Sequence, residues 1–152
     1  MNIQDDIFVS DLLNAGLPVR AFIGESLRKG ELLLWTPGIY TGFPILAQGE
    51  HGPLYPFNWL LFGLLPPYVA VAYAQLLPLF IAGLGCFLLA REWSLPLVPS
   101  AFAAGIFCLS GFFVSHLRHL GMNDSAGWIP FIFLTERLLR RSAPHAAVAL
   151  LV

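Results

Sequence analysis

The sequence predicts an all-α fold, a polytopic transmembrane helical bundle with an N-terminal extracytoplasmic loop that contains an amphipathic helix. No Asp, Glu, Lys or Arg lies between Glu50 and Arg91, or between Glu92 and Arg118. Hydrophobic residues make up 57% of the chain and charged residues 11%, with a mean hydropathy of +0.74. A soluble domain carries about 25% charged residues. A lipid bilayer is therefore the expected partner of most of the chain.

Composition also argues against several other classes of protein. A net charge of -1 leaves no basic footprint for nucleic acid. Residues 1–6 have neither a basic region nor an apolar run, so they do not form a signal peptide. Cys86 and Cys108 fall within apolar segments, where they pack as small apolar side chains. The sequence has no phosphate-binding G-x-x-x-x-G-K, C-x-x-C, H-E-x-x-H or G-x-S-x-G motif.

Residues 1–58 are the predicted extracytoplasmic loop. A helix opens at Leu17-Pro18, with proline in its first turn, and closes at Lys29-Gly30. Its apolar residues share one face and its basic residues lie elsewhere: Val19, Phe22, Ile23 and Leu27 against Arg20, Arg28 and Lys29. This pattern fits a helix in the membrane interface and equally a surface helix packed on its own protein.

The segment after this helix is rich in glycine and proline, which predicts an irregular loop. Its aromatic residues suit the headgroup layer of a bilayer: Trp35, Tyr40, Tyr55 and Trp59. Residues 57–65 are apolar but too short to cross a bilayer before Pro66-Pro67. We expect them to form a half-helix that dips into the membrane.

Residues 59–152 are predicted to hold the transmembrane helices. Residues 68–90 and 95–115 reach the length of about 20 residues that a crossing requires, and Arg91–Ser94 forms the turn between them. A third helix is predicted at about 124–138, and an unfinished span from 143. Small residues such as Gly83 and Gly105 favour close helix packing.

The arginines fix the predicted orientation, because short loops rich in Lys and Arg stay in the cytoplasm. Arg137, Arg140 and Arg141 then lie inside with Arg91, and residues 1–58 and 116–124 lie outside. An external N-terminus without a signal peptide leads us to expect one crossing helix before Met1. The apolar run up to Val152 leads us to expect more helices after it.

Three motifs carry a resemblance to a known family: W-x-P-x-x-x-x-G-x-P at Trp35–Pro44, Y-P-x-N at Tyr55–Asn58, and an early acid at Asp11. Ser110-Gly111-Phe112 and Trp128-x-Pro130 add to them. The chain resembles, from about Asp11 to Arg141, the YfhO-type bacterial membrane proteins of the GT-C superfamily of glycosyltransferases. The further matching residues are Pro18, Gly30 and His119.

The resemblance implies a multi-pass glycosyltransferase of the bacterial inner membrane. It would move a sugar from a polyprenyl-phosphate carrier to a glycan or lipid of the cell envelope. The implied catalytic residue is Asp11. The implied substrate-binding residues are Trp35, Tyr55, Asn58, Arg118, His119 and Asp124. No metal ligands are assigned, and the need for a divalent metal stays open.

Each implied role has a simpler alternative. Asp11 is suited to take a proton from the acceptor hydroxyl, or to serve as a helix cap, while Asp5 and Asp6 are expected to be solvated. His116 and His119, three residues apart, are too few ligands for a metal site. Arg118 with His119 could bind a phosphate or a sugar, and equally could solvate a loop.

Two other functions compete with sugar transfer. A transporter or lipid flippase would use helices broken at Pro66-Pro67 and Pro78 to line a substrate path. The predicted spans hold few polar residues for such a path, Tyr73, Gln75 and Ser110, which favours the enzyme. A non-catalytic assembly subunit is the third interpretation.

Overall fold

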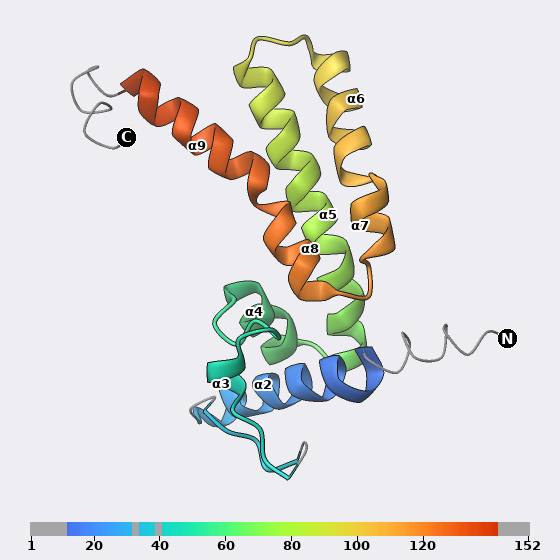
Figure 1. Ribbon diagram of the computed structural model, residues 1–152, viewed down its shortest axis with the longest axis vertical. Coiled ribbons are helices and arrows are strands. Elements are labelled where there is room, and N and C mark those ends of the chain that lie inside the picture. The colour runs from blue at the N-terminus through green and yellow to red at the C-terminus, as the bar shows by residue number, and fades with distance from the viewer. Residues whose placement is uncertain (1–11, 32–33, 39–40, 143–152) are drawn as a thin grey trace, which may run out of the picture. The chain divides into compact units, whose positions relative to one another are not determined.

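The computed structural model describes residues 12–31, 34–38 and 41–142, and every regular element in these ranges is a helix (Figure 1). The predicted span from 143 lies outside the described residues, as do Tyr40 and Asp11. The elements in chain order are the π-helical turn η1 (Leu12–Gly16), α2 (Leu17–Lys29), α3 (Ile45–Gln48), α4 (Pro56–Leu64), α5 (Pro67–Glu92), α6 (Leu97–Cys108), α7 (Gly111–Ser115), α8 (Leu120–Gly127) and α9 (Ile129–Ser142).

The chain forms two compact units. The first comprises the residues up to Leu77 together with His116–Met122, and the second comprises Pro78–Ser115 together with the residues from Asn123 onward. Helix α5 belongs to both units and divides between them at Pro78. This division differs from the predicted boundary at 58/59, because α4 and the first turns of α5 pack with the N-terminal residues.

Helix α2 begins and ends where the sequence predicted. Pro18 lies in its first turn, and Gly30 ends it in the left-handed conformation at φ 70°. The amides of Gly30 and Glu31 donate to the carbonyls of Leu27 and Ser26, the bonds of a Schellman cap. Lys29 bonds Glu25 at 2.7 Å and thereby lowers the pKa of that carboxyl group.

The apolar face of α2 packs on the chain itself. Val19 and Ile23 are fully buried against Ile45, the first residue of α3, and Phe43 packs beside them. Protein rather than lipid therefore covers this face. Of the two alternatives for the helix, the structure favours the packed one.

Helix α2 also makes contacts through its basic residues. Arg20 is buried, and its Nη1 donates to the carbonyl of Gly16 at 3.3 Å. Arg28 Nη1 donates to the carbonyl of Phe62 in α4 at 2.9 Å. Arg20 and Arg28 lie off the apolar face, as the sequence predicted, and each bonds backbone carbonyls from there.

Helix α4 is a packed helix of the first unit. Phe62 is buried with Ala70 and Ala74 of α5 and with Leu120 of α8. Trp59, on another face of α4, is more exposed, and its Nε1 donates to the carbonyl of Pro53 at 2.6 Å. One side of the predicted half-helix is therefore covered by protein.

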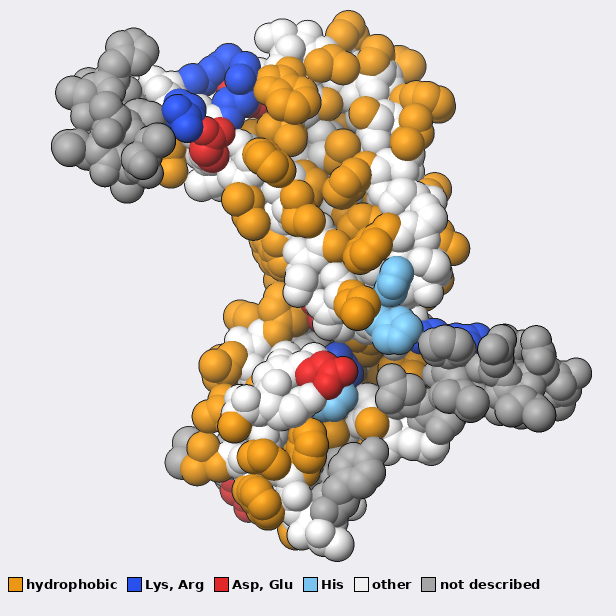
Figure 2. Space-filling model, in the orientation of Figure 1, with side chains coloured by type: hydrophobic (Ala, Val, Ile, Leu, Met, Phe, Trp, Pro, Cys, Tyr) orange, Lys and Arg blue, Asp and Glu red, His pale blue; other side chains and the backbone are white. Residues whose placement is uncertain are grey.

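Within the described residues, two segments are long and apolar enough to cross a membrane, Pro67–Glu92 and Leu97–Ser115. Only 28% and 11% of their most apolar windows are buried. Figure 2 shows hydrophobic side chains over these helices. Large exposed residues such as Phe80 and Phe102 are typical of a helix that faces lipid rather than a protein core.

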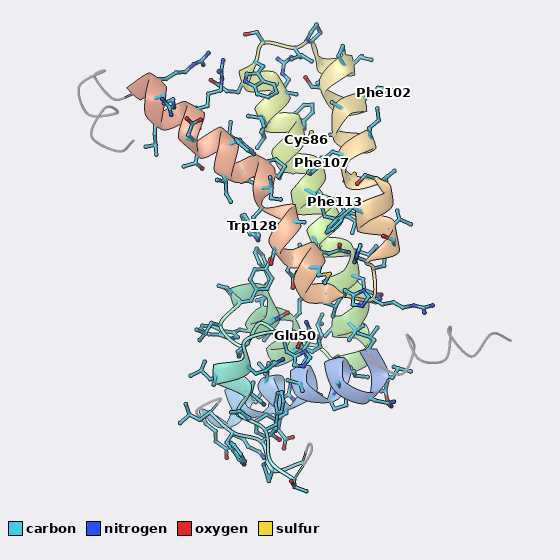
Figure 3. The ribbon with its side chains drawn as sticks, in the orientation of Figure 1. Glu50, Cys86, Phe102, Phe107, Phe113 and Trp128 are labelled. Atoms are coloured by element: carbon cyan, nitrogen blue, oxygen red, sulfur yellow. The ribbon has the colours of Figure 1, made fainter. Side chains whose placement is uncertain are left out.

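The predicted span at 95–115 is interrupted. Helix α6 ends at Cys108, a turn covers Leu109 and Ser110, and α7 follows. The rings of Phe107 and Phe113 meet edge to face across this turn, with centroids 5.6 Å apart (Figure 3). The amide of Asn123 donates to the carbonyl of Phe113 at 3.2 Å. This aromatic and polar packing supports the interruption.

The predicted helix at 124–138 is wrong as a single element, because the chain breaks at Trp128 between α8 and α9. Pro130 has no N–H to donate to a preceding turn, so it favours the start of a new helix. Gly127 lies so close to α5 that a Cβ there would come 2.9 Å from the carbonyl oxygen of Pro78.

The charged end of α5 meets α9 within the second unit. Glu92 Oε1 lies 3.5 Å from Arg137 Nε and 2.5 Å from Arg141 Nη1. The turn after α5 and the arginine cluster of α9 are therefore at one end of this unit. The predicted orientation requires them on one side of the membrane.

Candidate functional site

Trp35, an implied substrate-binding residue, anchors a short turn. Thr36 and Phe43 exchange both backbone hydrogen bonds at 2.9 Å. The indole of Trp35 lies over Gly42, where a Cβ would come 2.1 Å from Cζ2. Gly42 has φ +132°, which few other residues adopt. The W-x-P-x-x-x-x-G-x-P motif therefore builds a loop with a mostly exposed tryptophan.

The Y-P-x-N motif starts helix α4. Tyr55 is the N-cap residue, and Pro56 is the first helical residue. The buried amide of Asn58 donates to the carbonyls of His51 and Gly52 at 3.1 and 3.0 Å. Asn58 thus fixes the loop that precedes the helix, and Tyr55 is half-buried beside it.

That loop brings His51 to the buried Arg20. Arg20 Nη1 lies 3.4 Å from His51 Nδ1. Arginine has only donors, so Nδ1 can only accept in this contact. The guanidinium of Arg20 thus joins helix α2 to the loop before α4.

The segment that contains Arg118 and His119 belongs to the same unit. Gly121 abuts the loop before α4, where a Cβ would come 2.9 Å from the carbonyl oxygen of Glu50. The rings of His116 and His119 lie with centroids 5.6 Å apart, and Arg118 is exposed. No group of His, Cys, Asp and Glu in the described ranges could hold a metal ion.

The first unit therefore contains five of the implied site residues: Trp35, Tyr55, Asn58, Arg118 and His119. Asp124, which is half-buried, belongs to the second unit. Asp11, the implied catalytic residue, lies outside the described residues, so its role stays a prediction.

Arg20 and His51 were not among the residues that the sequence analysis selected. The available signal was the spacing of Gly16, Arg20 and Gly24, four residues apart on α2. Small residues on both sides of an arginine, one turn away, indicate a face that another backbone approaches closely. No family model, curated protein or solved structure matches the chain.

Proposed function

We propose that this chain is part of a multi-pass glycosyltransferase of the GT-C kind in the bacterial inner membrane. It transfers a sugar from a polyprenyl-phosphate carrier to a glycan or lipid of the cell envelope. The observation that carries this proposal is that the residues of both motifs and the segment with Arg118 and His119 lie in one compact unit. The exposed apolar surfaces of α5 and α6 support its placement in a bilayer.

The chemistry of this reaction fits the polar groups of the first unit. Sugar transfer from a lipid phosphate develops negative charge on the leaving phosphate, and a guanidinium stabilises that charge. It also needs a base for the proton of the acceptor hydroxyl. In this proposal Asp11 is the base, and the exposed Arg118 together with His119 binds the phosphate or the sugar. A divalent metal is not required by these roles.

The proposal also fixes an orientation. Residues 1–58 and 116–124 face the outside, where the acceptor is, and the turn after α5 faces the cytoplasm with the arginines of α9. The ion pairs of Glu92 with Arg137 and Arg141 support the second half of this arrangement.

The test is sugar transfer in membranes that contain the protein, with a polyprenyl-phosphate sugar as donor. Asp11→Asn keeps the shape of the side chain and removes the proton acceptor. Loss of a general base lowers a rate by about 10²–10⁴-fold, so we expect Asp11→Asn to transfer at least ~100-fold less sugar at equal expression. The control is Asp5→Asn, which should be close to wild type.

Retention of most activity by Asp11→Asn would make this residue structural and shift the role of base to another carboxylate, with Asp124 the next candidate. Lipid movement across the bilayer without any sugar transfer by the wild type would overturn the proposal in favour of a flippase.

A further inference from the structure

A groove lies in the second unit between the end of α5 and α9. Its volume is about 270 Å³. Leu89, Trp93 and Phe133 form its apolar walls. The rest is lined by Glu136 and three basic residues, Arg137, Arg140 and Arg141. We call it the arginine groove.

Carboxylates hold the guanidinium groups of the arginine groove in place. Glu92, largely shielded from solvent, contacts both Arg137 and Arg141 through one oxygen. Arg140 forms an ion pair with Glu136, which lies one turn earlier in α9. Three guanidinium groups thus face two carboxylates, which leaves the groove positive. Each guanidinium has five N–H donors, so donors remain for a ligand.

The walls of the arginine groove select among anionic ligands. Trp93 and Phe133 are each more than half exposed directly beside the arginines. A free inorganic anion gains nothing from two exposed rings, whereas a ligand with a phosphate joined to an apolar body uses both parts. The groove also lies at the end of α5, one of the two helices that are apolar enough to cross a membrane.

We propose that the arginine groove binds the phosphate of an anionic phospholipid, with the glycerol and first acyl carbons against Trp93 and Phe133. Basic pockets beside transmembrane helices on the cytoplasmic side bind such headgroups. This inference rests on the membrane placement in the proposed function, and it does not depend on sugar transfer.

The test is native mass spectrometry of the detergent-solubilised protein, titrated with phosphatidylglycerol or phosphatidylcholine. We expect selective binding of phosphatidylglycerol. Each arginine near such a phosphate contributes about 1 kcal/mol, so the double variant R140Q/R141Q should bind it about 30-fold more weakly. The matched control R140K/R141K keeps the charge and removes the planar fork, and should bind at least about fivefold more weakly than wild type. Helix content from circular dichroism checks that both variants fold.

If R140K/R141K bound phosphatidylglycerol with wild-type affinity, binding would depend only on general surface charge. That result would overturn the proposal of a specific site in the arginine groove. Full displacement of phosphatidylglycerol by inorganic phosphate would identify the groove as a site for a free anion and would overturn the proposal that it binds a lipid. Equal binding of phosphatidylglycerol and phosphatidylcholine would also overturn the proposal, because the groove would then not select an anionic headgroup. Recovery of the protein in water without detergent would instead overturn the membrane placement, independently of any lipid result.

Discussion

Gly24 of α2 faces the backbone carbonyl of Phe62 in α4, and a Cβ on Gly24 would come 2.1 Å from that oxygen. The same oxygen accepts a hydrogen bond from Arg28, one turn further along α2, at 2.9 Å. Arg28 also reaches the carbonyl of Gly63 at 3.3 Å. Carbonyls in the last turn of a helix have no partner within that helix. Helix α2 thus caps the end of α4 while the glycine lets the two backbones meet.

Gly24→Ala should destabilise the first unit, because the new methyl group meets backbone rather than a movable side chain. Overpacking of this kind costs about 1–3 kcal/mol. The measurement is the thermal midpoint of unfolding in detergent, followed by circular dichroism. The matched control is Gly63→Ala in α4, which meets no atom within 4 Å and should gain up to about 1 kcal/mol of helix propensity. Equal midpoints for both variants would contradict the close approach.

Gly42→Ala should open the turn that carries Trp35. The substitution strains a backbone at φ +132° and pushes the indole away. We expect faster hydrogen exchange at the amides of Thr36 and Phe43, which the turn protects. Gly38→Ala is the control, since its Cβ would meet only Thr36 Oγ1, at 3.8 Å. Unchanged exchange in Gly42→Ala would show that Trp35 does not hold this turn.

Glu92→Gln should cost more stability than Glu136→Gln. Glu92 contacts two arginines and is 14% exposed, whereas Glu136 is 50% exposed and pairs with Arg140 alone. An exposed ion pair is worth about 0.2–1 kcal/mol, and removal of one partner of a shielded pair costs more because the remaining charges lose their partner. Thermal unfolding of the two single variants measures the difference. A larger loss of stability in Glu136→Gln than in Glu92→Gln would contradict the expected contribution of the ion pairs of Glu92.

The proposed orientation is tested with single cysteines in a variant without Cys86 and Cys108. A membrane-impermeant thiol reagent on intact cells should label cysteine at Gln48 and at Met122, and leave cysteine at Ser94 unlabelled. All three positions are exposed. Gly121 is unsuitable because its Cβ would meet the carbonyl of Glu50. The reverse labelling pattern would overturn the orientation and the external sugar site together.

The sequence was sufficient to predict helices whose ends are set locally. Pro18 and Gly30 mark the ends of α2, and the uncharged stretch before Arg91 marks α5. It was insufficient where packing between distant segments decides. No residue near Arg20 in the sequence predicts its contact with His51. The interruption of the second apolar segment likewise depends on contacts among Phe107, Phe113 and Asn123.

The break at Trp128 is a different case, because its local signals are visible in the sequence. Gly127 and Pro130 flank the position, and proline favours the first turn of a helix. A single helix was predicted because the apolar content of the segment was given more weight than Gly127 and Pro130. Five of the residues selected for the candidate site belong to one compact unit, and their binding of a substrate stays a prediction.

The two ion-pair partners of Glu92 are synthesised later than Glu92 itself. The ribosome completes α5 and α6 well before it reaches Arg137 and Arg141. During that interval the nascent hairpin carries an acid whose partners do not yet exist. The contact between the end of α5 and α9 can therefore form only after α9 has been synthesised.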